Sequence, residues 1–333
     1  MNFNIVLPNK LNKINYFMKT ENGCRLCSHN GVATEVYIIV DYDLEIDKDF
    51  TITDSTLLAI SKLQPDVELK LNEKSIVAVS KKGRYTGKYL NNEHISPNVD
   101  YKNHCEVDLE YLNKASNYTS TNEKKPILMG VNVSADSTIM ATDGFKIYQY
   151  KGNATNQMEG TITINSNLVK MAYSIFNNKN IIVEYNKNTI SFKDGNIMVV
   201  GRLLEGNFPN LAPIFNMIEN EEKKPLDKDE ILECLEFTKM TGSNSKMKDL
   251  GCYAMLQRDK FIGKSDETFE KEICYEGGDI VFDANFLELV LKTFKGSNIY
   301  ISTKDNGKGT LACFNEEGND LERVVLLGVA KEV

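Results

Sequence analysis

The sequence predicts an α+β protein of three tandem domains, each with two helices packed on antiparallel sheet. Its 333 residues are 41% hydrophobic and 26% charged, which supplies several cores and is too mixed for a disordered chain. A strand followed by a capped helix occurs three times, and alternating strands follow each copy. Antiparallel sheets with helices grouped on one face are the architecture that such a pattern favours.

Each copy of the repeated unit has a short strand, an Asn or Asp at the helix cap, and a helix. The three copies cover residues 50–58, 161–169 and 279–287. Their expected caps are Asp54, Asn165 and Asp283. The caps are about 110–120 residues apart, which is the size of one domain. The repeat therefore predicts three domains of similar size.

Further strands and helices accompany each unit. Alternating apolar residues predict strands over 67–71, 75–80, 180–185, 189–193, 298–303 and 310–314. Helical patterns precede the units at 10–18, 108–118 and 227–240. Polar residues at 102–104 and 220–224 are expected to be linkers. The expected domains are therefore 1–107, 108–217 and 218–333.

The formal net charge of −8 argues against a general nucleic-acid-binding protein, yet several expected helices have lysines opposite their apolar stripe. In the helix after the second cap, for example, Lys170 lies opposite Leu168. Other lysines placed in this way are Lys13, Lys19, Lys62, Lys292 and Lys295. The helix over 227–240 instead has Glu233 and Glu236 opposite its apolar side. Basic faces are typical both of solvated helices and of surfaces that bind phosphates.

No metal, cofactor or disulfide is expected. The seven cysteines are an odd number scattered among apolar residues, as is typical of reduced, buried thiols. Cys24 and Cys27 have His29 nearby, but a zinc site needs a fourth ligand and no second pair stands at a usual spacing. The sequence has no run of about 18 apolar residues and no signal-peptide core, so we expect a cytoplasmic protein without membrane contact.

Two segments of the middle domain carry the most distinctive pattern. Residues 139–148 predict a β-hairpin with Asp143-Gly144 at its turn. Residues 201–210 predict a strand that leaves through a Phe208-Pro209 turn. The order and spacing of these segments resemble the bacterial sliding clamp, the DNA polymerase III beta subunit. The threefold repeat extends this resemblance over essentially the whole chain.

The resemblance implies three clamp domains in each chain and a homodimer that forms a ring around double-stranded DNA. Such a ring binds DNA without reading its sequence, because its contacts are with backbone phosphates. It is not an enzyme, and its other partners are a DNA polymerase and the clamp loader. The DNA-binding residues that we expect are Lys13, Lys19, Arg25, Lys62, Lys124, Lys125, Lys170, Lys292 and Lys295.

Sliding clamps also bind short peptides of their partners in an apolar pocket between the second and third domains. The residues that the resemblance assigns to this pocket are Leu128, Thr142, Gly144, Phe145, Lys146, Ile147, Pro209, Ile214, Met247, Phe286, Val324 and Leu326. Their mainly apolar composition suits peptide anchors, and the aliphatic members equally suit an ordinary core. Phe145-Lys146 replaces the family's usual His-Arg, and the C-terminal segment 324–333 lacks the usual proline. We therefore expect an altered peptide specificity.

Two other functions are compatible with parts of the sequence. A clamp-fold protein that captures clamp-binding peptides without encircling DNA is favoured by the acidic face over 227–240. An enzyme is disfavoured, because the histidines at 29, 94 and 104 are distant in sequence from the hairpin. Nor does the sequence contain a Gly-rich phosphate loop or a nucleophile motif.

Overall fold

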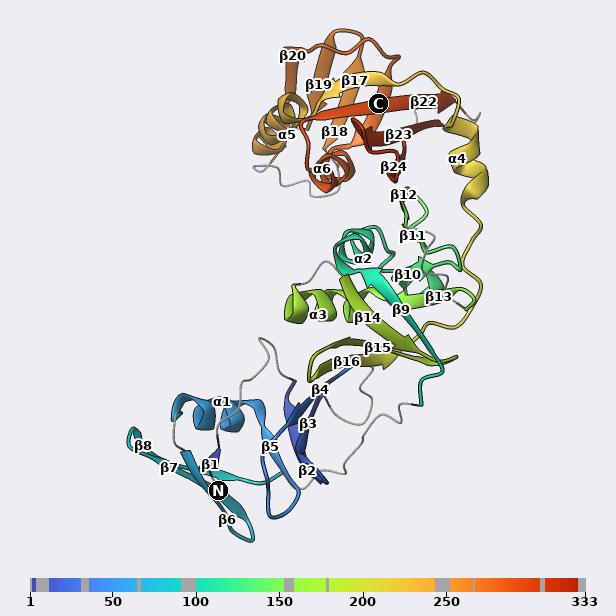
Figure 1. Cartoon of the computed structure of the whole chain (residues 1–333). Helices are drawn as coiled ribbons and strands as arrows, with labels where there is room; N and C mark the ends of the chain where they lie inside the picture. The colour runs from blue at the N-terminus through green and yellow to red at the C-terminus, as the bar shows by residue number, and fades with distance from the viewer. Residues whose placement is uncertain are drawn as a thin grey trace. The chain divides into compact units, whose positions relative to one another are not determined.

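The fold is described by a computed structural model, which covers residues 2–3, 12–30, 36–64, 67–90, 100–152, 159–177, 180–242, 252–265, 267–305 and 309–328 (Figure 1). The chain forms two compact units and contributes two segments to each. The first unit comprises 1–116 and 155–205, and the second comprises 117–154 and 206–333.

Two antiparallel sheets lie in the first unit. The longer one has the order β5-β2-β3-β4-β16-β15-β14-β9. Its strands are β2 (Ile14–Thr20), β3 (Gly23–His29), β4 (Val36–Tyr42), β5 (Phe50–Thr53), β9 (Asn103–Asp108), β14 (Asn180–Tyr185), β15 (Thr189–Asp194) and β16 (Ile197–Arg202). The shorter sheet has the order β1-β6-β7-β8 and consists of β1 (Asn2–Phe3), β6 (Val67–Leu71), β7 (Ser75–Ser80) and β8 (Gly83–Lys88). Since β4 pairs with β16, the longer sheet combines strands from both sides of the expected boundary at residue 107.

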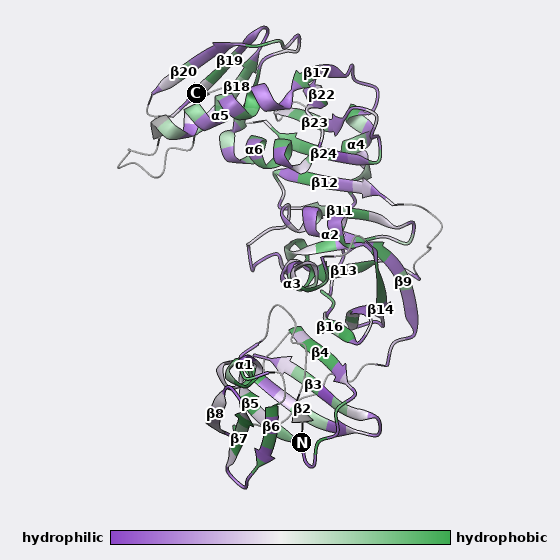
Figure 2. Ribbon diagram, turned by 60° about the vertical axis from the view of Figure 1, so that its left-hand side comes forward, coloured by the Kyte–Doolittle hydropathy of each residue, from purple (hydrophilic) through white to green (hydrophobic). Residues whose placement is uncertain are grey.

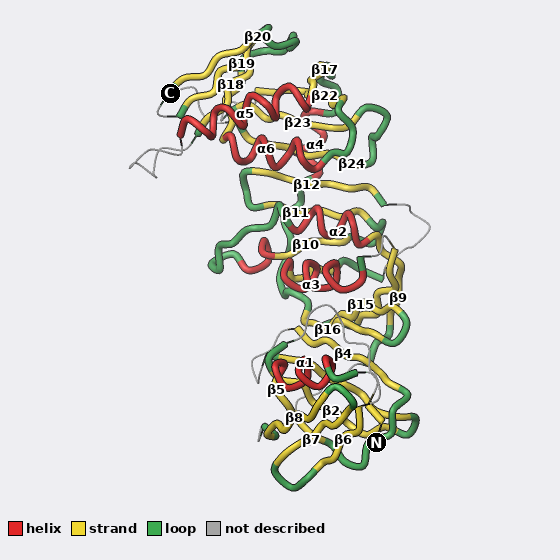
Figure 3. The backbone as a smooth tube through the Cα atoms, turned by 90° about the vertical axis from the view of Figure 1, so that its left-hand side faces the viewer, coloured by secondary structure: helices red, strands yellow, loops and turns green. Residues whose placement is uncertain are grey.

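Three helices of the first unit cover these strands. They are α1 (Asp54–Lys62), α2 (Leu109–Ser116) and α3 (Ser166–Phe176), the last of which follows β13 (Ile162–Asn165). In α1, the fully buried Leu57 and Ile60 join an apolar core with Ile38 and Val40 of β4. Helices α2 and α3 lie side by side (Figure 3).

The second unit repeats this design. The strands that this unit contributes to its long sheet follow the order β10-β11-β12-β24-β23-β22-β17, and its short sheet has the order β20-β19-β18-β21. The long sheet contains β10 (Gly130–Val133), β11 (Thr138–Thr142), β12 (Lys146–Lys151), β17 (Lys224–Asp227), β22 (Asn298–Asp305), β23 (Thr310–Glu316) and β24 (Glu322–Leu327). The short sheet contains β18 (Tyr253–Gln257), β19 (Lys260–Lys264), β20 (Thr268–Glu272) and β21 (Ile280–Asp283).

The helices of the second unit are α4 (Ala212–Ile218), α5 (Lys228–Gly242) and α6 (Ala284–Thr293), with a short 3₁₀ helix over Pro126–Met129. Helix α5 packs beside α6, and hydrophilic residues run along much of α5 (Figure 2). The described helices include none that is long and apolar enough to cross a membrane.

The repeated strand, cap and helix are present in all three expected places. Asn165 and Asp283 cap α3 and α6 as predicted, with side-chain oxygens that accept from backbone N–H groups of the first turn. At the first copy the predicted cap is wrong by one residue. Thr53, and not Asp54, accepts from the Thr56 N–H, and Asp54 is the first residue of α1.

Two other sequence-based assignments are wrong. The helix expected over 10–18 is contradicted by β2, which begins at Ile14 and pairs with both β3 and β5. Asn15 and Phe17 are fully buried two residues apart, which is the period of a strand and not of a helix. The expected linker at 102–104 includes Asn103 and His104, which belong to β9. The division into three domains itself stays a prediction.

Candidate functional site

The candidate peptide-binding site lies on one face of the long sheet of the second unit, where α4 contacts β22 and β23. We call this surface the α4 face. It carries Ile147, Cys313 and Val325, which are paired neighbours on β12, β23 and β24. Because side chains alternate between the faces of a strand, these two pairings determine which other residues share the face.

The turn between β11 and β12 forms one end of the α4 face. The Thr142 hydroxyl donates to the Lys146 carbonyl (2.8 Å) and accepts from the Gly144 N–H (3.0 Å). Asp143 accepts from the backbone N–H groups of Phe145 (2.9 Å) and Lys146 (3.0 Å). Gly144 has a φ of +100°, a conformation that favours glycine. The turn is thereby held rigid, as the predicted hairpin requires.

Phe145 extends from this turn with 60% of its surface exposed. Its carbonyl accepts from the Leu327 N–H (2.9 Å), which ties the turn to the end of β24. An exposed aromatic ring beside an apolar cluster is a feature of surfaces that anchor a partner's side chain.

An apolar cluster occupies the α4 face next to this turn. Its buried members are Ile147, Leu211, Phe215, Ile218, Leu311, Cys313 and Val325. Four half-buried residues pack against them, namely Met140, Phe208, Ile214 and Leu327. The Phe-Pro turn that precedes α4 places Phe208 here, and it turns at Gly206, whose φ is +127°. The half-buried members supply apolar surface that a peptide can cover.

The last strand presents different residues to this surface from those that the sequence predicts. Val325 and Leu327 belong to the cluster on the α4 face. Val324 and Leu326 pair with Tyr148 and Lys146 and are fully buried on the opposite face. Residues 324–327 are all apolar, so the sequence contains no alternation that could show which pair faces the cluster.

Lys146 and Phe286 also lie away from the α4 face. Lys146 is 6% exposed, forms an ion pair with Asp143, and has its Nζ 4.6 Å from the centre of the Phe286 ring in α6. The predicted pocket residues are thus divided between two faces of one sheet. Thr142, Ile147 and Ile214 are on the α4 face, whereas Lys146, Phe286, Val324 and Leu326 are not.

The remaining predicted pocket residues have varied settings. Pro209 is exposed in the turn before α4, and Leu128 is half-buried in the 3₁₀ helix. Met247 lies outside the described residues. Sequence reasoning missed Met140, Phe208, Leu211, Phe215, Ile218, Leu311, Cys313, Val325 and Leu327. One available signal was Pro213, since a proline in the first turn is typical of a helix start and would have indicated α4.

Some of the predicted DNA-binding residues are exposed as expected, and others are ion-paired or do not lie on a helix. Lys62 and Lys170 are exposed on α1 and α3, and Lys124 and Lys125 are exposed in the segment before the 3₁₀ helix. Lys13 and Lys19 do not lie on a helix, because β2 replaces the one expected there. Arg25 forms a two-pronged ion pair with Asp41 (2.6 and 2.9 Å), so its charge is already compensated. Lys295 lies beyond the end of α6.

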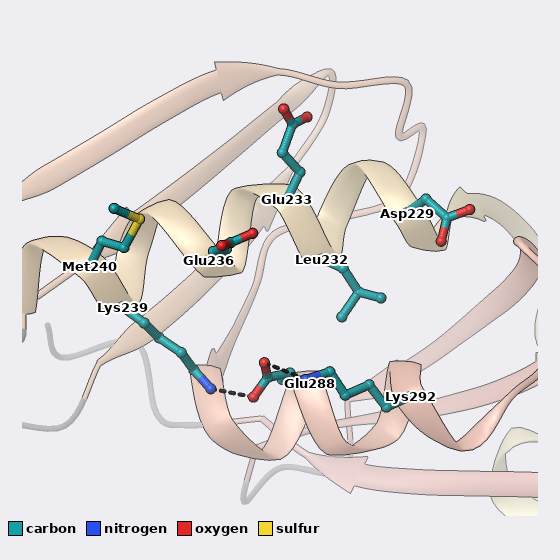
Figure 4. A pocket seen from close by; sticks show the side chains of 8 residues that line it. All are labelled: Asp229, Leu232, Glu233, Glu236, Lys239, Met240, Glu288 and Lys292. Carbon is teal, nitrogen blue, oxygen red and sulfur yellow. Dashed lines mark hydrogen bonds and ion pairs between the residues drawn. The ribbon is translucent and has the colours of Figure 1, made fainter.

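The face of α5 and α6 is a groove with more acidic than basic groups (Figure 4). It has a volume of about 780 Å³ and is lined by Asp229, Leu232, Glu233, Glu236, Lys239, Met240, Glu288 and Lys292. Both lysines bind Glu288, which lies between them; the Lys292 Nζ is 2.9 Å from its carboxylate. Lys239, and after it Lys292, lowers the pKa of Glu288 below its ordinary value. The charge of Lys292 is therefore partly compensated by a carboxylate that it shares with Lys239, which makes Lys292 a weaker candidate for binding phosphate.

The described residues contain no group of three or more His, Cys, Asp and Glu that could hold a metal ion. Burial raises the pKa of the Cys24 thiol to about 11 and that of Cys27 to about 12. Thiols with such values are neutral near pH 7, and it is the thiolate that binds metals. The two cysteines belong to different apolar clusters of the first unit.

Comparisons with known proteins agree with this architecture. Residues 110–210 match the family model of the DNA polymerase III beta subunit, central domain. The beta subunit of DNA polymerase from Streptococcus pyogenes has a TM-score of 0.81 and 17% identity, over 96% of this chain and 92% of that chain. The DNA polymerase III subunit beta from Pseudomonas aeruginosa has a TM-score of 0.79 and 15% identity, over 96% and 93%. That from Thermotoga maritima has a TM-score of 0.78 and 18% identity, over 96% and 91%.

No curated protein matches the chain by sequence. At 15–18% identity the structural similarity establishes the fold, and the family model adds a sequence match for the middle of the chain. The chain therefore has the sliding-clamp fold, and its residues 110–210 match the central-domain model of the DNA polymerase III beta subunit.

Proposed function

We propose that this chain is a DNA sliding clamp, a non-catalytic processivity factor that acts in the cytoplasm. Two copies encircle duplex DNA as a ring, and the ring tethers a polymerase through a peptide held on the α4 face. The observation that carries the proposal is the clamp fold over nearly the whole chain, joined to an apolar cluster beside the hairpin turn. The clamp loader opens and closes the ring in this proposal.

Closure of the ring requires contacts between two copies. Strands β8 and β20 are edge strands of their sheets, and edges offer unpaired backbone groups to another chain. Exposed Arg84 and Lys88 make β8 basic, whereas exposed Glu270 and Glu272 make β20 acidic. Head-to-tail pairing of β8 with the β20 of a second copy would therefore join opposite charges.

Sedimentation at about 10 µM protein tests this pairing, and we expect a dimer. Arg84→Glu should shift the protein toward monomer, and adding Glu272→Arg should restore the dimer by exchanging the charges. A wild-type protein that remains monomeric would contradict the ring. Failure of the exchange to restore the dimer would place the contact elsewhere.

The peptide site is tested with a labelled peptide of the Gln-Leu-x-Leu-Phe type. We expect a Kd in the micromolar range, which corresponds to about 8 kcal/mol. Ile147→Asp and Leu327→Asp should each abolish binding, because they place a charge in the apolar cluster. Leu321→Asp is the matched control, since Leu321 is 46% exposed and lies outside that cluster. Equal loss in the control would show a general effect on folding.

Encirclement is tested by retention on nicked circular DNA at moderately high salt, with a loader-containing extract. A ring stays on the circle and slides off once the circle is cut, whereas a protein bound only by charge is lost to salt from both forms. A known clamp loaded in the same extract is the positive control.

The alternative function is capture of clamp-binding peptides without encirclement of DNA. The acidic groove between α5 and α6 favours it, because negative charge opposes phosphate binding. Peptide binding combined with equal behaviour on circular and cut DNA would support this alternative.

A further inference from the structure

A small cavity lies on the α4 face at the opposite end from the hairpin turn. It has a volume of about 310 Å³ and is lined by Lys151, Phe215, Ile218, Glu219, Lys223, Ser302, Cys313, Asn315, Asp320 and Arg323. Arg323 and Leu327 are four residues apart on one strand, so this cavity and the hairpin end of the face are separated by about 13 Å. The peptide site does not account for the cavity.

The strand register brings polar side chains together at this end. Asn315 pairs with Arg323, and Arg323 pairs with Gln149, so all three share the α4 face. Ser302 is opposite Cys313 on the same face. Ser302, Asn315 and Gln149 are each only 5% exposed. Buried polar groups on a face that is apolar elsewhere need partners.

Arg323 is held in a fixed position in this cavity. Its Nη2 donates to the Gln149 Oε1 (2.9 Å), and its guanidinium lies 5.1 Å from the centre of the Phe215 ring. Its Nε is buried and has no hydrogen-bond acceptor among the described residues. The hydroxyl of Ser302 likewise makes no side-chain hydrogen bond in the part of the chain that the structure describes. Both groups therefore have unused hydrogen-bonding capacity.

The charge of the cavity is positive although the protein is acidic. Lys151, Lys223 and Arg323 outnumber the two acids, Glu219 and Asp320. Lys223 pairs with Asp320 (2.8 Å), and the Arg323 Nη1 is 4.0 Å from Glu219. Both acids are at the rim, with 56% and 83% of their side chains exposed, whereas the Arg323 side chain is 16% exposed. Burial raises the pKa of the Cys313 thiol to about 11, so that this group adds no negative charge near pH 7.

We propose that this cavity is a binding site for an oxyanion, a carboxylate or a phosphate group, held by the Arg323 guanidinium and the Ser302 hydroxyl with Lys151 and Lys223 nearby. A planar guanidinium with a free N–H matches the oxygens of either group. The cavity shares Phe215, Ile218 and Cys313 with the apolar cluster of the proposed peptide site, but its polar groups lie outside that cluster, and it does not depend on encirclement of DNA.

Titration calorimetry of the full chain with inorganic phosphate, and separately with glutarate, tests the proposal. We expect saturable binding of one ligand per chain to at least one of the two, and the better ligand identifies the source of the oxyanion. Arg323→Gln should weaken the binding at least tenfold, and Ser302→Ala should weaken it severalfold. Lys264→Gln is the matched control, because it removes an exposed positive charge of the same unit outside the cavity.

Ser302→Ala also guards against a folding artefact, since it removes one hydroxyl and leaves Arg323 packed on Phe215. The proposal is overturned if neither ligand binds saturably, or if both cavity variants bind as tightly as Lys264→Gln. Binding of the Gln-Leu-x-Leu-Phe peptide to the same variants is measured alongside. Retained peptide binding with lost oxyanion binding shows that the two sites are independent.

Discussion

The helix pairs α2–α3 and α5–α6 have the same role in their units but opposite charge. In the first pair Lys170 is exposed, Lys114 lies 5.0 Å from the ring of Tyr111, and Glu110 is in the first turn of α2. In the second pair the groove has four acids and two lysines, and both lysines bind Glu288. Buried apolar positions maintain the packing in both pairs, which leaves the solvent-facing charges free to differ.

This difference shows that a shared fold does not imply a shared electrostatic field. A sliding clamp holds DNA through its backbone charge, so the two helix pairs should contribute unequally to retention. The first unit should supply most of the attraction, and the α5–α6 face should supply little or oppose it. Four predictions test this comparison.

The largest effect on DNA retention is expected from reversing charges in the first unit. Lys62→Glu combined with Lys170→Glu should reduce the slope of log affinity against log salt by about 2, since two phosphate contacts are lost. Retention on nicked circular DNA over a series of salt concentrations measures this slope. Lys292→Glu is the control from the second unit and should change the slope by less than 1, because Glu288 already compensates part of the Lys292 charge. Equal effects of Lys170 and Lys292 would refute the comparison.

A smaller effect on the salt slope of DNA retention, with the opposite sign, is expected from a charge reversal in the second unit. Glu236 is exposed and has no ion-pair partner among the described residues, so Glu236→Lys should cost little stability. It should raise the salt slope by about 1 if the groove faces DNA. Glu276→Lys is an exposed control outside the groove with the same change of charge. A rise in both variants would show that only net charge matters.

The helix caps allow the two helix pairs to be compared in stability. Asp283 accepts two backbone N–H bonds at the start of α6 (2.8 and 3.2 Å), whereas Asn165 accepts one at the start of α3 (2.9 Å). Asp283→Ala should cost about 1.5 kcal/mol and Asn165→Ala about 1 kcal/mol. Hydrogen exchange of the amides in each helix measures the two losses separately. Equal protection losses would mean that the second bond contributes nothing.

The smallest effect is expected from Glu288→Gln, which releases Lys239 and Lys292. The ion pairs are partly exposed, so the loss should be below about 1 kcal/mol at pH 7. Because the lysines lower the pKa of Glu288, their contribution is present above its ordinary value of 4.5 and is lost as the pH falls through the lowered pKa. Urea denaturation should therefore show the difference at pH 7 and a smaller one below pH 4.5. A difference independent of pH would exclude this linkage.

Local patterns in the sequence predict much of the fold. The strands over 67–71, 75–80 and 180–185 are observed with the predicted bounds, and Asn165 and Asp283 cap their helices as expected. These features depend on neighbouring residues, since alternation and capping act within a few positions. The helix expected over 10–18 is wrong because its apolar residues are explained by pairing with two distant strands.

The peptide site itself stays a prediction, but local turn chemistry explains its hairpin turn, whereas strand register decides on which face its other residues lie. Thr142 and Gly144 shape the hairpin turn as expected from the Asp-Gly pair. On β24 the pattern cannot distinguish Val324 and Leu326 from Val325 and Leu327, and only pairing with β12 shows which two reach the cluster. No local sequence pattern indicates the cavity around Arg323, because its residues come from α4 and from several separate strands.

The sequence by itself determined the caps of α3 and α6, the alternating strands and the hairpin turn, because each follows from interactions between near neighbours. Only the tertiary structure decided which face of β24 meets α4, and that Glu288 of α6 pairs with Lys239 of α5. Those outcomes depend on residues that are far apart in the chain. Their contacts form only when strand pairing and helix packing bring them together.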